Sequence, residues 1–142
     1  MMPVDVNQGD AHQQDHHVRE HVLAALDRLT GLINAQDMAA LKEFYPAPDT
    51  VFIGSEAWEI IEGPVKLAEF FETICAQPDR FSWSWRHRSV SSFGDVAWLY
   101  ADGEFIRTGA EGEDRTPYRV TGVLIFVDGH WRWRQFHGAQ PI

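Results

Sequence analysis

The chain has 142 residues, of which 44% are hydrophobic and six are tryptophan, so it is long enough for one domain with a substantial core. Its formal net charge of −9 argues against binding to nucleic acids or to anionic membrane surfaces. The single cysteine, Cys75, excludes an intrachain disulfide and a cysteine-rich metal site. The first residues lack the apolar core of a signal peptide, and no apolar run is long enough to cross a membrane. We therefore expect a cytoplasmic protein.

The N-terminal part predicts helices. Residues 1–14 are polar and are expected to form a disordered tail, whereas residues 15–142 are expected to form a single domain. A helical repeat of apolar residues begins near Asp15. Asp37 is placed to cap a second, short helix, which ends before Pro46.

Two short strands and a third helix follow. The strands are predicted at residues 50–53 and 58–61, and the third helix opens at Gly63-Pro64 because proline suits a first helical turn. Pro78 ends this helix. Its buried stripe is predicted to comprise Leu67, Phe70, Phe71 and Ile74.

The C-terminal half predicts two β-hairpins. Gly94-Asp95 and Asp128-Gly129 are the expected turns, and residues 108–117 are an acidic, glycine-containing segment expected to form a mobile loop. Helices followed by an antiparallel meander indicate an α+β fold with the helices on one face of a curved sheet. The strands are predicted at residues 80–93, 96–107, 118–127 and 130–137.

The turns fix the predicted register, and the register decides which side chains share a face. In the last hairpin, pairing of Val127 with His130 sets Gly122 beside Gln135, with His137 at the end of the same row. In the preceding hairpin, three cross-strand pairs are expected, namely His87 with Asp102, Ser89 with Tyr100 and Trp85 with Glu104.

One predicted sheet face is aromatic and is expected to cover the helices and to line a cavity. It comprises Trp83, Trp85, His87, Trp98, Tyr100, Asp102, Glu104, Leu124, Phe126, Trp131, Trp133, Gln135 and His137. The other face mixes apolar residues with arginines and has no obvious cover, so we expect a homodimer through this outer face unless the face is merely mixed. It comprises Arg86, Arg88, Val90, Leu99, Val123, Ile125, Arg132, Arg134 and Phe136.

The order of elements and several motifs resemble the SnoaL-like group of the nuclear transport factor 2-like superfamily. The motifs are Asn34-Ala-Gln-Asp37, Phe44-Tyr45, Glu62-Gly63, and the ending from Asp128-Gly129-His130-Trp131 through Phe136-His137-Gly138. The ending also resembles the association domain of calcium/calmodulin-dependent kinase, a member of the same superfamily. The resemblance implies a cone-shaped fold in which a strongly curved antiparallel sheet wraps around N-terminal helices and leaves an internal pocket. Because this fold hosts enzymes, binding proteins and oligomerisation modules, the resemblance is weak evidence for an activity.

His87 and Asp102 are the candidate catalytic pair. An imidazole held by a carboxylate in a partly dry cavity is a plausible acid/base pair, and the resemblance to SnoaL-like cyclases implies an Asp with a nearby His for proton transfer. The alternative is a structural pair at the strand ends.

The candidate substrate-binding residues share the same aromatic face or lie near it. His137 and Tyr100 are expected either to bind a ligand oxygen or only to line the cavity, and Glu104 lies either deep in the cavity or at its rim. Some of the aromatic residues are expected to be core and some to bind a planar apolar ligand. The full set is Phe52, Trp58, Trp83, Trp85, Trp98, Tyr100, Glu104, Phe126, Trp133, Gln135 and His137.

The sequence departs from the steroid isomerases of the superfamily. The places of their catalytic Tyr, Asp base and protonated acid hold Leu29, Ile53 and Gly122, so steroid isomerisation is not expected. We expect the chain to bind a small, mainly apolar molecule without metal or cofactor. If it is an enzyme, acid/base isomerisation, dehydration or cyclisation is expected; the alternative is a non-catalytic ligand-binding or oligomerisation module.

Overall fold

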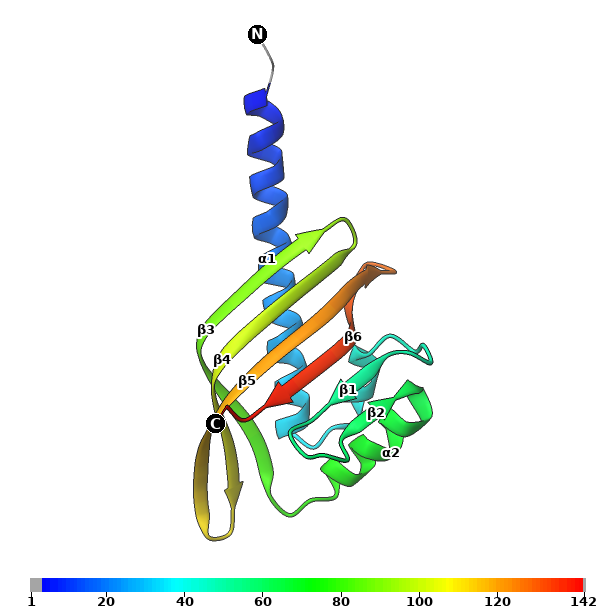
Figure 1. Cartoon of the computed structure of the whole chain (residues 1–142), viewed down its shortest axis with the longest axis vertical. Helices are drawn as coiled ribbons and strands as arrows, with labels where there is room; N and C mark the ends of the chain where they lie inside the picture. Colours follow the sequence, from blue (N-terminus) through cyan, green and yellow to red (C-terminus); the bar gives the residue numbers. More distant parts are fainter. Residues whose placement is uncertain (1–3, 142) are drawn as a thin grey trace.

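A computed structural model shows the α+β architecture that the sequence predicts (Figure 1). It describes residues 4–141, with side chains from residue 16 onward. The elements are α1 (Val4–Asn34), the 3-10 helix η1 (Met38–Glu43), β1 (Val51–Ile53), β2 (Ile60–Glu62), α2 (Gly63–Cys75), β3 (Arg80–Phe93), β4 (Val96–Gly109), β5 (Gly112–Val127) and β6 (His130–Ala139).

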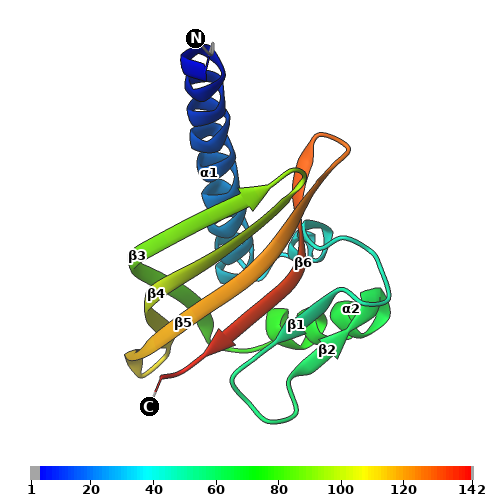
Figure 2. The same cartoon turned by 45° about the horizontal axis from the view of Figure 1, so that its top comes forward.

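The six strands form one curved, open sheet in the order β2-β1-β6-β5-β4-β3 (Figure 2). Neighbouring strands are antiparallel except for β1 and β6, which are parallel. The curvature brings one face of the sheet around the helices, as the predicted cone fold requires.

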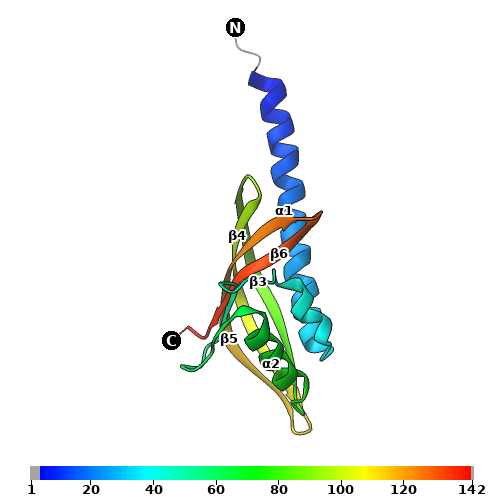
Figure 3. The same cartoon turned by 90° about the vertical axis from the view of Figure 1, so that its right-hand side faces the viewer.

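Helix α1 lies along one face of the sheet and projects beyond it (Figure 3). Val22, Leu26 and Leu29 are fully buried on its sheet-facing side. The helix begins at Val4, well before the expected start near Asp15. The predicted disordered tail remains a prediction, because residues 1–3 and the side chains of residues 4–15 lie outside the described part of the chain.

The predicted starts of η1 and α2 are confirmed. The Asp37 side chain accepts a hydrogen bond from the Ala39 amide at 2.9 Å and so caps η1. Helix α2 opens at Gly63-Pro64 as expected. Its predicted stripe is confirmed for three buried residues, Leu67, Phe70 and Phe71, while Ile74 is partly buried against the same core.

Residues 108–117 do not form the loop that the sequence predicts. They continue β4 and β5 into a projecting hairpin that closes with the pair Gly109 and Gly112 (Figure 1). Arg115 forms ion pairs with Glu113 at 2.8 Å and with Glu104 at 3.6 Å. The prediction was wrong because acidic residues and glycines were read as loop signals, although opposite charges also stabilise cross-strand contacts.

The turn of the final hairpin is confirmed. Asp128 and Gly129 have φ values of 51° and 79°, as a two-residue turn with a left-handed backbone requires. Val127 pairs with His130 on either side of it, which is the predicted register at the turn.

A bulge in β3 changes the register of the first hairpin. His87 pairs with Asp102 and Ser89 with Tyr100, as predicted. Beyond the register shift between Trp85 and His87, however, Trp85 pairs with Gly103, so its predicted pairing with Glu104 is wrong. A bulge adds one residue to one strand and so interrupts the alternation of side chains between the two faces. Odd-numbered residues before the bulge therefore lie on one face of the sheet, and odd-numbered residues after it lie on the other.

A second bulge does the same in the last hairpin. Leu124 pairs with Trp133, but Val123 pairs with Gln135 and Gly122 with Phe136. The predicted pairing of Gly122 with Gln135 is therefore wrong. Phe136 turns into the core, and Gln135 is exposed on the opposite face.

The predicted faces are exchanged along β4, and along β3 and β6 on one side of each bulge, whereas β5 keeps the faces that the sequence predicts. The face toward the helices carries the buried Ala97, Leu99 and Ala101, whereas Trp98 and Tyr100 are 46% and 49% exposed on the far side. The prediction was wrong because both faces are partly apolar, and the larger side chains were assigned to the core. We call the far side the outer face; it carries His87, Trp98, Tyr100, Asp102, Arg119, Val123, Ile125, Gln135 and His137.

Aromatic rings form the centre of the core between α2 and the sheet. Phe52 of β1 stacks on Phe136 of β6 with ring centroids 4.8 Å apart, and Phe70 packs on the other side of Phe52 at 4.7 Å. Trp133 contacts Phe136 edge-on at 5.3 Å. These contacts join β1 and β6 to α2, and Phe52 and Phe70 also line the cavity described below.

Candidate functional site

An inner cavity of about 370 Å³ opens between α2, the segment after β1 and the helix-facing side of the sheet. Its walls are mainly aromatic and include Phe52, Phe70, Phe71, Phe81, Trp83 and Phe105. A cavity that combines aromatic walls with several polar groups is a common form of a small-molecule site. Its polar lining includes Glu59, Arg107, Tyr118 and Gln140.

Tyr118 supplies a buried hydroxyl to this cavity. Its side chain lies on β5 and is 7% exposed, and a Cβ added at Gly138 would overlap the phenol oxygen. Burial, with a smaller contribution from the charge of Glu59, raises the pKa of Tyr118 to about 12. Tyr118 is therefore a neutral O–H donor at physiological pH, and its hydroxyl makes no hydrogen bond to a described residue.

Glu59 supplies a carboxyl group to the same cavity. The segment between β1 and β2 holds it: the Glu56 amide donates to Glu59 Oε1 at 3.0 Å, and the Gly54 amide donates to the Glu59 carbonyl at 2.8 Å. A Cβ at Gly54 would lie 2.7 Å from Glu59 Cδ, so glycine makes room for the side chain. Burial raises the pKa of Glu59, although the Glu56 amide opposes this shift. This carboxyl group is thus more readily protonated than an exposed one.

Two further polar groups lie around the cavity. The Arg107 guanidinium lies over the Phe81 ring at 5.4 Å and pairs with Asp79 at 3.4 Å. Trp83 Nε1 is buried without a hydrogen-bond partner among the described residues. The aromatic walls therefore carry polar groups at a few separate points.

Sequence reasoning found part of this cavity. Phe52, Trp58 and Trp83 were predicted ligand contacts and do line it, but Glu59 and Tyr118 were missed. Tyr118 lies on the same helix-facing row of β5 as Gly122 and Leu124, which the sequence assigned correctly, so continuing that alternation to the start of β5 would have found it. Glu59 had no comparable signal, because its position depends on how the segment between β1 and β2 folds back.

Most of the other predicted ligand contacts lie elsewhere. Trp133 is fully buried core, and Trp85 packs against the core. Phe126 is 42% exposed beside Trp131, and Glu104 pairs with Arg115. The remaining predicted contacts are on the outer face, namely Trp98, Tyr100, Gln135 and His137.

His87 and Asp102 are neighbours on the outer face and do not line the inner cavity, so the expected shared cavity is wrong. His87 Nε2 lies 3.2 Å from the Tyr100 hydroxyl. Asp102 instead accepts hydrogen bonds from Arg119 at 3.2 Å and from Arg86 at 3.3 Å. The Arg119 hydrogen bond, followed by that of Arg86, lowers the pKa of Asp102. The catalytic role of this pair stays a prediction.

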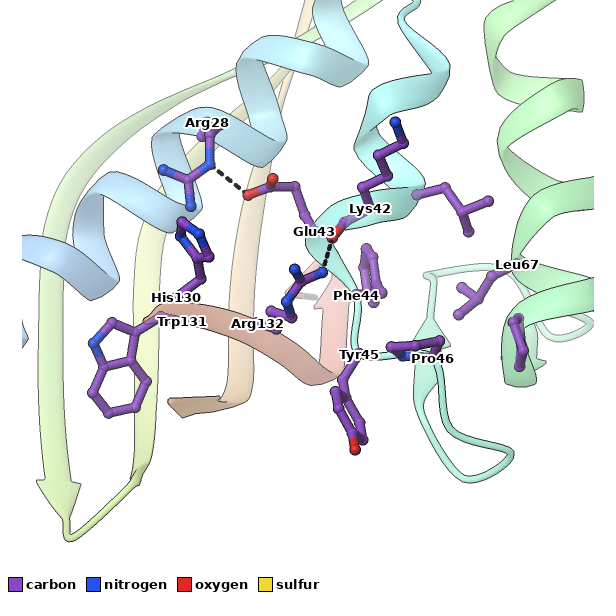
Figure 4. Close-up of a pocket in the computed structure, with 12 residues that line it drawn as sticks. Arg28, Lys42, Glu43, Phe44, Tyr45, Pro46, Leu67, His130, Trp131 and Arg132 are labelled. Carbon is purple, nitrogen blue, oxygen red and sulfur yellow. Dashed lines mark hydrogen bonds and ion pairs between the residues drawn. The ribbon is translucent and has the colours of Figure 1, made fainter. Parts of the chain in front are cut away.

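A second cavity, the edge groove, lies where α1, η1 and the start of β6 meet (Figure 4). It has a volume of about 620 Å³ and combines apolar walls with the charged side chains Arg28, Glu43 and Arg132. Arg28 Nε donates to Glu43 Oε1 at 2.6 Å, and Arg132 Nη1 donates to the Lys42 carbonyl at 2.9 Å.

Within the part of the chain whose side chains are described, no three His, Cys, Asp or Glu side chains cluster in a way that would hold a metal ion. No helix there is both long and apolar enough to cross a membrane.

Comparisons with solved structures place the fold. The chain is similar to a nuclear transport factor 2-like superfamily protein from Salmonella enterica serovar Typhimurium LT2, with a TM-score of 0.77 and 20% identity over 89% of this chain and 93% of that one. It is also similar to a putative dehydratase of the same family from Streptomyces avermitilis, with a TM-score of 0.75 and 15% identity over 87% and 96% of the two chains. A third similar structure is a putative calcium/calmodulin-dependent protein kinase II association domain from Xanthomonas campestris, with a TM-score of 0.71 and 20% identity over 84% and 85%. At these identities the likeness concerns the fold.

The sequence itself identifies the family. No curated protein matches the chain. The family model of the SnoaL-like domain, however, matches residues 22–142, which span the end of α1, η1, α2 and all six strands. The chain therefore belongs to the SnoaL-like domain family, with the fold of the nuclear transport factor 2-like superfamily.

Proposed function

We propose that the protein binds a compact, mainly apolar molecule with a carbonyl group in the inner cavity. The observation that carries this proposal is that one aromatic cavity is lined by both a neutral phenol, Tyr118, and a carboxyl group of raised pKa, Glu59. The aromatic rings favour a flat, apolar body, and the phenol favours a ligand oxygen that accepts a hydrogen bond. A cavity of about 370 Å³ suits a molecule of one or two fused rings.

The same two groups support acid/base chemistry without a cofactor. Tyr118 would donate to a ligand carbonyl and stabilise negative charge that develops on its oxygen. Glu59 would remove or return a proton at a neighbouring carbon, because a carboxyl group of raised pKa exchanges protons more easily near neutral pH. Isomerisation, dehydration or cyclisation fits this arrangement. The Streptomyces avermitilis neighbour is named a putative dehydratase, which is compatible with it.

Binding of 1-tetralone, a neutral bicyclic ketone, tests the proposal by isothermal titration calorimetry. Tyr118→Phe removes one hydroxyl and keeps the ring, so we expect its Kd to rise about three- to tenfold, as for the loss of one neutral hydrogen bond. Tyr100→Phe removes the matching hydroxyl from the outer face and is expected to leave Kd unchanged. Absence of binding, or a loss caused by Tyr100→Phe and not by Tyr118→Phe, would contradict the proposal.

The predicted catalytic pair remains a second candidate, supported by the contact between His87 and the Tyr100 hydroxyl. Its test is the double variant His87→Ala with Asp102→Asn, once a substrate is identified. Unchanged turnover in this variant excludes the pair. Turnover lost in Glu59→Gln with the pair intact supports the inner cavity.

We also propose a homodimer through the outer face. Its contact residues differ from those that the sequence predicted for the dimer surface. Val90, Leu99 and Phe136 of the predicted dimer surface face the helices instead. The outer face exposes Trp98, and the hairpin beside it exposes Phe93 and Val96. An apolar surface of this kind is typical of a subunit contact, which is compatible with the alternative of an oligomerisation module. Light scattering after size exclusion should give a dimer mass, and Trp98→Glu should give the monomer mass; a monomeric wild type would refute the dimer.

A further inference from the structure

The edge groove lies apart from the inner cavity and shares none of the acid/base groups proposed there. Arg28 comes from α1, Glu43 and Phe44 from η1 and its end, and His130 and Arg132 from the start of β6. Figure 4 shows the guanidinium groups of Arg28 and Arg132 on the same side of the groove, with the His130 ring between them. Two separate elements, α1 and the start of β6, thus bring basic side chains to one hollow of a protein whose net charge is −9.

The existing contacts leave positive charge available in the groove. The Glu43 carboxylate is held by Arg28 Nε, and its side chain is only 15% exposed, against 48% for Arg28. Glu43 is therefore already paired at the wall, while the rest of the Arg28 guanidinium reaches the solvent side. Arg132 uses Nη1 to donate to the Lys42 carbonyl, an uncharged partner, so its positive charge is not neutralised by this contact. A guanidinium of this kind recognises a carboxylate well, because it can donate through more than one N–H.

The remainder of the groove is apolar. Phe44 and Leu67 are buried at 3% and 1% exposure, and Leu41 and Pro64 continue the same wall. A ligand that fits both parts has a carboxylate at one end and a hydrocarbon body at the other. The groove volume of about 620 Å³ accommodates a chain of roughly eight to twelve carbons.

We propose that the edge groove is a second binding site, which takes a carboxylate with an apolar body. Arg132 binds the carboxylate, Arg28 adds positive charge beside it, and the apolar wall around Leu67 holds the hydrocarbon part. The site is independent of the ligand proposed for the inner cavity, so either proposal can fail without the other.

Calorimetric titration with octanoate, and with 1-octanol as the neutral match, tests the site. Wild-type protein should bind octanoate at least tenfold more tightly than 1-octanol, and the affinity for octanoate should fall as salt rises. Arg132→Gln should weaken octanoate binding about tenfold. Arg19→Gln is the matched control, because it removes the same charge from an exposed residue of α1 that does not line the groove, and it should bind like wild type.

A variant of the inner cavity separates the two sites. Ile74→Trp adds bulk to a residue that lines the inner cavity and not the groove, so it should weaken 1-tetralone binding and leave octanoate binding unchanged. Circular dichroism and thermal unfolding confirm that each variant is folded, and Arg28→Gln replaces Arg132→Gln if the latter is not. No octanoate binding at about 10 mM, equal binding of octanoate and 1-octanol, or loss of octanoate binding in Ile74→Trp alone would overturn the proposal.

Discussion

The bulge in β6 predicts how substitution of three consecutive residues changes the free energy of unfolding. Phe136 is 1% exposed, stacks on Phe52 and contacts Trp133, whereas Gln135 and His137 are exposed on the outer face. Phe136→Ala removes a buried ring and leaves a cavity, so it should lower the free energy of unfolding by about 3–5 kcal/mol. Gln135→Ala and His137→Ala should change it by no more than about 0.5 kcal/mol, as is usual for surface positions.

Urea unfolding followed by circular dichroism measures these differences through the transition midpoint at constant slope. Because a loss of this size is a large part of the stability of a domain, Phe136→Leu provides a milder variant that should cost less than about 1.5 kcal/mol. In a register without the bulge, Gln135 and His137 would face the helices and Phe136 would face away from them. A loss under about 1 kcal/mol for Phe136→Ala, together with a larger loss for His137→Ala, would therefore refute the bulge and the face assignment.

Two further predictions concern the groups of the inner cavity. Gly138→Ala should lower the free energy of unfolding by about 1–3 kcal/mol because the new Cβ overlaps the Tyr118 phenol. As a control, Gly31→Ala in α1, where no atom lies near the new Cβ, should raise the free energy of unfolding by roughly 0.5–1 kcal/mol. A Gly138→Ala protein as stable as wild type would contradict the contact between Gly138 and Tyr118. Glu59→Gln should raise the melting temperature at pH 7 and not below pH 4.5. Folding raises the pKa of the Glu59 carboxyl group, so protonated Glu59 contributes stability that is complete below the ordinary pKa of 4.5 and is lost as pH rises through the folded pKa. Glutamine does not titrate and therefore loses no stability over this range. A melting-temperature difference that does not change with pH would mean that folding does not raise the pKa of Glu59.

Local sequence signals predicted most of the elements. The Asp128-Gly129 turn, the Asp37 cap and the Gly63-Pro64 helix start all depend on residues that are close in sequence, and the structure has each of them. The pairing of His87 with Asp102 was also predicted, because it follows from counting residues back from the turn at Gly94.

The faces of the sheet were not predictable by the same counting. A bulge shifts parity by one residue, and nothing in the residues around Arg86 or Arg134 distinguishes a bulge from a regular strand. The bulges put His87 and His137 on the outer face and Phe136 on the helix-facing side, each opposite to its predicted face, while Trp83 faces the helices as predicted. The candidate site depends on tertiary structure in the same way, because Glu59 meets Tyr118 only when the segment between β1 and β2 folds against the sheet.

In the proposed function the ligand occupies the inner cavity and not the outer face. Intermolecular nuclear Overhauser effects between bound 1-tetralone and methyl-labelled protein test it directly. Ile33 and Ile74 line the inner cavity, and Val123 and Ile125 lie on the outer face. Binding in the inner cavity predicts effects from the tetralone ring protons to the methyl groups of Ile33 and Ile74. Effects to Val123 and Ile125 alone would contradict it.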